Sequence, residues 1–151
     1  MYSLLRVNGV NFSKIKDDPV RPHLSFAFRT ECGREIYYLY DEMQSKYGAV
    51  ICVAYTNEVP TSEYELELFS QISYQDNQHG SIAVFYTVWS YDKGCGRDII
   101  FRLAKNLKNY NGCKRFVTLS PKTEMAEKFH LSNGAFLLSK NKETDNYEYE
   151  L

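Results

Sequence analysis

The sequence lacks a hydrophobic run long enough to cross a membrane. Its longest apolar stretches cover residues 47–55 and 82–89, less than half of the roughly 20 residues that a spanning helix needs. The first ten residues also lack a charged segment followed by a long apolar core, which is the pattern of a signal peptide. We therefore expect no membrane partner and a cytoplasmic location.

A strong excess of charge of either sign is also missing. The chain contains 18 Lys and Arg against 19 Asp and Glu, which gives a formal net charge of -1 at pH 7. The field of the whole molecule would therefore attract neither nucleic acid nor an anionic membrane. We expect no nucleic-acid partner, and any anion-binding site has to be local.

Cysteines at metal-ligand spacing are absent as well. Cys32, Cys52, Cys95 and Cys113 form no CxxC motif, so we expect neither disulfides nor a zinc site. The three histidines are scattered along the chain without a partner at ligand spacing. No metal is therefore expected.

What the sequence does have is an ordinary balance of 44% hydrophobic and 25% charged residues, which is typical of a globular protein. Its 151 residues suit one domain, and no repeat or linker divides them, so we expect residues 1–151 to form a single domain. Thirteen tyrosines raise the aromatic content to 15%. Because basic residues do not interleave with them as in a single-strand groove, we expect them in the core and pocket walls, chiefly Tyr37, Tyr38, Tyr40, Tyr47, Tyr55 and Tyr86.

The first half of the chain has two apolar, β-branched runs, residues 48–56 and 81–89, which predict strands buried on both faces. Ser62 followed by Glu65 predicts a capped helix that ends near residue 69. The apolar spacing within residues 33–44 predicts a further helix. A first strand is expected at residues 3–8 and loops at residues 11–22 and 75–80.

The second half alternates helix and strand with short connections. Amphipathic spacing predicts a surface helix at residues 97–110 and another at 122–130. Strands are expected at residues 115–119, 135–139 and 147–151. The fold class is therefore α/β with a mixed sheet.

A Gly-x-Gly turn, YDKGCGR at residues 91–97, joins the strand at 81–89 to the helix that follows it. Such a turn presents backbone N–H groups at the positive end of a helix dipole, where a phosphate or pyrophosphate can bind. It is neither a P-loop nor a dinucleotide fingerprint, and a plain turn with a solvated basic helix face stays open. The candidate cofactor-binding residues are Val88, Trp89, Tyr91, Lys93, Gly94, Cys95, Gly96 and Arg97.

Positive charge is concentrated around this turn. Within residues 93–115, only Asp98 opposes the basic residues Lys93, Arg97, Arg102, Lys105, Lys108, Lys114 and Arg115. We expect a docking surface for a compact anionic ligand rather than for a nucleic-acid duplex.

The order strand, Gly-x-Gly turn, helix, strand, helix, strand resembles the acyl-CoA-binding core of the GCN5-related N-acetyltransferase superfamily. TLSP at 118–121, FHLSNGA at 129–135 and NYEY at 146–149 also resemble, in order, segments of the catalytic domain of malonyl-CoA decarboxylases. The resemblance implies a single-domain acetyltransferase-like fold, with a mixed central sheet flanked by helices and a turn that holds the pyrophosphate of acyl-CoA. It also implies Ser120, His130 and Tyr147 as catalytic residues.

Each of these three residues also has a purely structural interpretation. Ser120 precedes Pro121 and would cap a helix, His130 could be a surface cation near a helix end, and Tyr147 could be an aromatic residue of an edge strand. As a catalytic residue, His130 would donate a proton with a pKa near its ordinary value of about 6.5.

The function that the resemblance favours is acetyl transfer from acetyl-CoA, or another acyl-CoA, to an amine of a small molecule or a protein. One alternative is a malonyl-CoA decarboxylase-like enzyme that gives acetyl-CoA and carbon dioxide. A second is a non-catalytic acyl-CoA-binding protein. A homodimer stays open.

Overall fold

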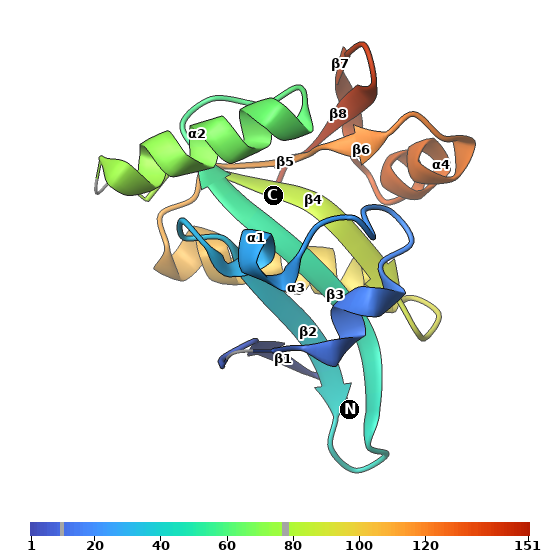
Figure 1. Ribbon diagram of the computed structural model, residues 1–151. Coiled ribbons are helices and arrows are strands. Elements are labelled where there is room, and N and C mark those ends of the chain that lie inside the picture. The colour runs from blue at the N-terminus through green and yellow to red at the C-terminus, as the bar shows by residue number, and fades with distance from the viewer. Residues whose placement is uncertain (10, 77–78) are drawn as a thin grey trace.

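The computed structural model describes residues 1–9, 11–76 and 79–151. A mixed sheet of eight strands forms its centre (Figure 1), which confirms the predicted α/β class. All neighbouring strands are antiparallel except β4 and β5. In sheet order the strands are β1 (Ser3–Arg6), β2 (Glu35–Asp41), β3 (Lys46–Thr56), β4 (Ile82–Ser90), β5 (Arg115–Thr118), β8 (Thr144–Tyr149) and β6 (Ser120–Pro121), and β7 (Phe136–Lys140) also pairs with β8.

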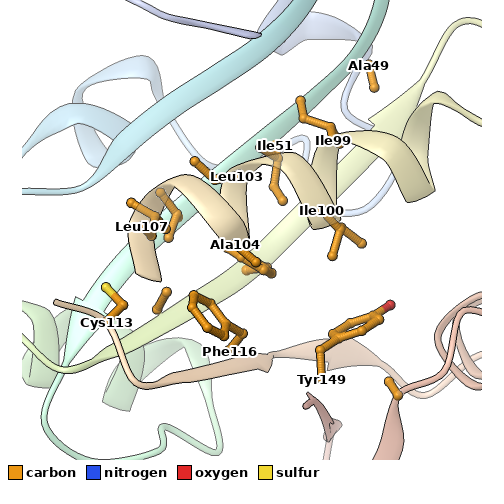
Figure 2. Packing of buried hydrophobic residues seen from close by; sticks show 14 of the residues in the cluster. Ala49, Ile51, Ile99, Ile100, Leu103, Ala104, Leu107, Cys113, Phe116 and Tyr149 are labelled. Atoms are coloured by element: carbon orange, nitrogen blue, oxygen red, sulfur yellow. The ribbon is translucent and has the colours of Figure 1, made fainter. Parts of the chain in front are cut away.

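Helices cover both faces of the sheet (Figure 1). They are the 3₁₀-helix η1 (Ser13–Asp17), α1 (Phe26–Thr30), α2 (Glu63–Gln75), α3 (Cys95–Tyr110) and α4 (Glu124–Ser132). The apolar stripe of α3, including Ile99, Ile100 and Leu103, packs on one face (Figure 2). Leu66 of α2 and the rings of α1 pack on the other. None of the helices described is both long and apolar enough to cross a membrane.

Strand β4 contains a register shift that redirects its side chains. Phe85 lies opposite Val53 of β3 and Thr87 lies opposite Cys52, so Tyr86 is an extra residue without a partner, as in a β-bulge. Tyr86 packs in the core on the α2 side of the sheet. Thr87 turns its hydroxyl to the same side, and the bulge therefore places two consecutive side chains on one face.

Most of the predicted elements are confirmed, among them the strands at residues 48–56 and 81–89 and the helix at 97–110. The Ser62 hydroxyl accepts a hydrogen bond from the Glu65 N–H at 3.1 Å, as the capping pattern predicts, but this helix continues to Gln75. Residues 77–78 of the expected loop at 75–80 lie outside the described residues. The short helix α1, capped by Ser25, was not predicted.

The predicted helix at residues 33–44 is wrong, because this segment forms β2. β2 pairs with β1 on one side and with β3 on the other. Its spacing of apolar residues fits a helical face by coincidence. Tyrosines at 37, 38 and 40 favour a strand, and pairing with the long buried strand β3 outweighs the short periodicity.

Candidate functional site

A gap in the sheet opens a cavity beside β4. β4 and β5 pair only as far as Phe85 and Thr118, and the Leu119 N–H makes one more hydrogen bond, to the Phe85 carbonyl at 3.3 Å. Beyond this point the chain of β5 turns into β6, which pairs with β8 instead. The strands diverge, and a cavity of ≈ 300 Å³ opens between the second half of β4, residues 119–121 and α4.

This cavity brings five of the predicted site residues together. They are Val88, Trp89, Gly96, Ser120 and His130. Another five belong to the turn and the start of α3 without lining the cavity: Tyr91, Lys93, Gly94, Cys95 and Arg97. Tyr147 lines a separate hollow between α4 and the β7–β8 hairpin.

The turn before α3 is built around glycine and aspartate. Gly94 is the N-cap residue, with a φ of 84° that disfavours other residues, and a Cβ there would meet nothing within 4 Å. Asp92 fixes the turn, because its carbonyl accepts from the Cys95 N–H at 3.2 Å and its Oδ1 accepts from the Lys93 N–H at 3.0 Å. The N–H groups of the first helical turn have no acceptors within the helix. This end of α3 is therefore suited to an anion.

Gly96 connects this helix end to the cavity. A Cβ at Gly96 would lie 3.2 Å from Cζ of Phe129, a residue of α4 that also lines the cavity. Glycine therefore lets α4 approach the first turn of α3. An anion at this helix end would be continuous with the cavity between β4 and β5.

The basic residues around the turn do not form one docking surface. Arg102 is bonded to the Tyr2 carbonyl at 2.9 Å, Lys108 to the Leu151 carbonyl at 2.7 Å, and Arg115 to Glu148. Lys93 and Arg97 are the two that lie at the helix start. Arg97 lies over the Phe101 ring, at 4.7 Å from its centroid.

Two further candidates have structural partners. Tyr91 donates its hydroxyl proton to Asp17 Oδ2 at 2.6 Å and accepts from Trp89 Nε1 at 3.0 Å, which ties the end of β4 to η1. Burial and the neighbouring carboxylate raise the pKa of Tyr91 to about 12. Cys95 is buried in the core beneath α3, and burial raises its pKa. Its thiol is a packing group rather than a reactive one.

Ser120 does not cap a helix. The cap of α4 is Thr123, whose hydroxyl accepts from the Ala126 N–H at 3.2 Å. Ser120 lies in β6, buried, with its hydroxyl 2.8 Å from that of Thr118. The Thr118 hydroxyl already accepts from the Tyr147 N–H at 3.0 Å. Thr118 can donate its own hydroxyl proton to the Ser120 oxygen. The hydroxyl proton of Ser120 is then free to point into the cavity.

His130 is a buried, uncharged residue rather than a surface cation. Its side chain is 5% exposed, and burial lowers its pKa to about 4. The expectation of a pKa near the ordinary value is therefore wrong, because the ring lies in the wall of the cavity and not in water. At neutral pH it carries one proton on one of its two ring nitrogens.

The partner of His130 determines which nitrogen holds that proton. Nδ1 lies 2.8 Å from the hydroxyl of Tyr149, whose pKa is raised by burial, with Asn133 and Arg97 acting against this rise. Tyr149 therefore keeps its proton, and Nδ1 of His130 is an acceptor within hydrogen-bonding distance of it. The Tyr149 proton is donated to Nδ1, so Nε2 of His130 carries the hydrogen. The cavity thus presents two hydrogen-bond donors, Ser120 and His130.

Tyr147 contacts His130 without entering the cavity. It lies in β8, which has neighbours on both sides, so the expectation of an edge-strand residue is wrong. Its buried ring lies 5.1 Å from the His130 ring, centroid to centroid. Tyr147 lines the separate hollow beyond α4. Tyr149, two residues later, is the tyrosine that hydrogen-bonds to the histidine.

The loop before α1 forms the opposite wall of the cavity through Pro19 and Val20. Asp18 holds this loop from within: its Oδ1 accepts from the Val20 N–H at 2.8 Å and from the Thr87 hydroxyl at 2.9 Å. Its Oδ2 accepts from Nη1 of Arg29 at 2.7 Å, and both side chains are fully buried. Arg21 donates to the carbonyl of Tyr86 at the bulge. The wall is therefore fixed by a buried ionic network.

Sequence reasoning missed several of these residues. Tyr149, Thr118 and Phe129 belong to the three motifs at 118–121, 129–135 and 146–149, so position in a motif could have drawn attention to them. Pro19 and Val20 carried no signal, because a polar segment interrupted by prolines predicts only a loop.

Lowering the pH is expected to destabilise the protein through His130. Its pKa of about 4 in the folded state lies below its ordinary value of 6.5. The unfolded chain therefore binds more protons between these values, and the free energy of unfolding decreases as the pH falls through this window. Melting temperatures at pH 7 and pH 5 should show a smaller loss for His130→Asn than for the wild type. An exposed control, His23→Asn, should retain the full loss, and equal losses in all three proteins would contradict the prediction.

Comparison with known proteins shows what this architecture resembles. No family model matches the sequence, and no curated protein matches it. Among solved structures, an acetyltransferase from Bacillus subtilis in complex with CoA has a TM-score of 0.68 at 8% identity, covering 100% of this chain and 99% of that one. This chain has the acetyltransferase fold.

Two further structures extend the likeness. A malonyl-CoA decarboxylase from Cupriavidus metallidurans has a TM-score of 0.56 at 16% identity, over 86% of this chain but only 33% of that one. The ribosomal-protein-S5-alanine acetyltransferase from Vibrio fischeri has a TM-score of 0.50 at 9% identity, over 76% of this chain and 59% of that one. Acetyltransferases and the decarboxylase therefore share this fold, as the resemblance in the motifs predicted.

Proposed function

We propose that the protein is an acyl-CoA-dependent enzyme, an N-acetyltransferase that moves an acetyl group from acetyl-CoA, or another acyl group from its CoA thioester, to an amine of a small molecule or a protein. The observation that carries the proposal is the continuity between the anion-suited start of α3 at Gly96 and the cavity that contains Ser120 and His130. A long ligand with a phosphate group at one end and an acyl group at the other fits this arrangement. A B. subtilis acetyltransferase of this fold has been solved with CoA.

In acetyl transfer the amine nitrogen attacks the thioester carbon. A C–N bond forms, the C–S bond breaks, and one proton moves from nitrogen to sulfur. Negative charge develops first on the carbonyl oxygen, and hydrogen-bond donors that are already fixed in position stabilise that charge. The Ser120 hydroxyl and the His130 Nε2–H are such donors. Tyr149 acts through His130 as a positioning residue, since it fixes the ring and its tautomer.

Decarboxylation of malonyl-CoA is a second candidate, favoured by the same two donors and the motifs that contain them. The C–C bond to the carboxylate breaks, carbon dioxide leaves, and the electron pair remains as a thioester enolate that takes up a proton at carbon. A hydroxyl and an Nε2–H suit both the carboxylate and the enolate oxygen. This chain spans a third of the decarboxylase that it resembles.

The location belongs to the same proposal. The four cysteines are free thiols in the structure, and three of them are buried. A reducing compartment such as the cytoplasm suits them.

The described residues include no group of three or more His, Cys, Asp or Glu side chains placed to hold a metal ion.

Binding of CoA is the first test. Calorimetry with CoA and acetyl-CoA should give saturable binding, and Arg97→Ala should weaken it about tenfold or more, because a charge-assisted hydrogen bond to phosphate is lost. Lys105→Ala is the matched control: it lies on the same helix, further from the first turn, and should bind CoA like the wild type. No binding to the wild type, or equal weakening in both variants, would overturn the proposed site.

Turnover then separates the candidates. Release of free CoA from acetyl-CoA only when an amine is present supports the transferase. Formation of acetyl-CoA from malonyl-CoA without an acceptor supports the decarboxylase instead. CoA binding with neither reaction would make the chain a non-catalytic acyl-CoA-binding protein.

A further inference from the structure

The cavity walls carry no charged side chain among the described residues that line them. The loop wall presents Pro19 and Val20, and α4 presents Met125 and Phe129. The polar lining groups, such as Thr87, are neutral. A ligand that enters this space therefore meets apolar surface and a few uncharged hydrogen-bonding groups.

Charges close behind the loop wall are already neutralised. Asp18 is paired with Arg29 at 2.7 Å, in a fully buried ion pair. Arg21 is paired with Glu63 at 3.0 Å, and Glu63 also contacts His23. These carboxylates are satisfied, so they offer no counter-charge to a cation that enters the cavity.

His130, the lining residue that becomes a cation when protonated, is uncharged as well. Its Nδ1 is occupied by Tyr149, and its Nε2 presents a hydrogen. The ring therefore cannot accept a proton from an ammonium group through Nε2. Arg97, whose Nη1 donates to Asn133 Oδ1 at 3.3 Å, acts electrostatically on the Tyr149 hydroxyl that contacts His130, and this positive charge also opposes a cation.

An alkylammonium ion would lose its hydration in this cavity without gaining a partner, and an unpaired charge away from water is costly. An amine that is already neutral in solution has no such cost. We propose that the acyl acceptor is a weakly basic amine, uncharged at neutral pH and attached to an apolar or aromatic body, as in an arylamine. This inference rests on the proposed acyl transfer and narrows its substrate class.

The reaction balances without a charged base in the wall. The neutral nitrogen attacks the thioester carbon, the C–N bond forms and the C–S bond breaks. The proton that the nitrogen loses ends on the thiolate, so the products are an N-aryl amide and free CoA. An alkylamine can follow the same course only through its unprotonated fraction. Below the pKa of the amine, this fraction increases about tenfold for each unit by which the pH rises.

Two isomeric amines test the inference. 4-Methylaniline and benzylamine have the same composition, but only benzylamine is protonated at pH 7. We expect a higher kcat/KM with acetyl-CoA for 4-methylaniline at pH 7, with little change up to pH 9. The kcat/KM for benzylamine should increase about tenfold per pH unit over this range. A kcat/KM for benzylamine at pH 7 equal to or above that of 4-methylaniline, without this increase, would overturn the inference.

A matched pair of variants changes the charge of the wall alone. Val20→Glu places a carboxylate in the cavity, and Val20→Gln places a neutral group of the same shape there. Val20→Glu should increase kcat/KM for benzylamine at pH 7 about tenfold or more over Val20→Gln, as expected for one supplied counter-charge, with thermal unfolding used to verify that both fold. If both variants fold and have equal kcat/KM values for benzylamine, the charge of the cavity wall does not select the acceptor.

Binding separates a failure of this inference from a failure of the proposed function. Both amines are titrated, by NMR, into the protein saturated with CoA. Tighter binding of 4-methylaniline supports the inference even without turnover. If benzylamine alone binds, or if neither amine binds, the inference about the acceptor is overturned. The proposed acyl-CoA site still stands in that case, provided that CoA binds. Absence of CoA binding overturns the proposed function itself.

Discussion

Replacing Asp18 by asparagine is expected to destabilise the protein by about 3–5 kcal/mol, because the change leaves the guanidinium of Arg29 buried without its counter-charge. Arg29 is fully buried, and its Nη1 lies 2.7 Å from Asp18 Oδ2. Asparagine can retain the hydrogen bonds from the Val20 N–H and the Thr87 hydroxyl. The variant therefore isolates the charge from the shape of the side chain.

Urea unfolding followed by circular dichroism measures this effect. Asp17→Asn is the matched control, since the neighbouring carboxylate is exposed and accepts one hydrogen bond, from Tyr91. It should lose no more than about 1 kcal/mol. A loss below about 1 kcal/mol for Asp18→Asn as well would show that the buried ion pair does not hold the loop.

A pair of substitutions at His130 should separate its two nitrogens. His130→Asn keeps a polar atom near the position of Nδ1, beside Tyr149, and removes Nε2. It should lower kcat/KM about 100-fold or more, the usual range for loss of a positioned catalytic group. His130→Gln can place an amide N–H near the position of Nε2, and should retain activity within about tenfold of the wild type.

The control measurements decide whether such losses are catalytic. Both variants should bind CoA with the affinity of the wild type and unfold cooperatively. If His130→Asn and His130→Gln lose the same activity, Nε2 has no separate role. If both remain fully active, His130 is a packing residue and the chemistry lies elsewhere in the cavity.

Sequence patterns predicted the fold class because its long elements are strongly periodic or strongly apolar. β3 and β4 are nearly continuous apolar runs, and α3 has a clear apolar stripe. β2 was predicted as a helix because its seven residues are too few for periodicity to distinguish the two structures. What decides its structure is its pairing with β1 and β3, which no local pattern contains.

The sequence indicated candidate residues of the site, but not the hydrogen bonds that join them. Ser120 and His130, which the resemblance implied as catalytic residues, line one cavity, and Gly96 joins it to the turn. The roles of Thr118 and Tyr149 depend on hydrogen bonds between segments that are distant in sequence. The pKa of His130 depends on burial, which only the packed structure reveals.

The extra residue in β4 changes which face of the sheet the later side chains of the strand occupy. Before Tyr86, side chains alternate between the two faces of the sheet, and after it the alternation resumes with the opposite phase. Thr87 and Trp89 reach the side of the loop and α2 only because of this change. Adding or deleting one residue in β4 would change the face of the sheet for side chains on one side of the change, so this strand tolerates substitution more readily than a change in length.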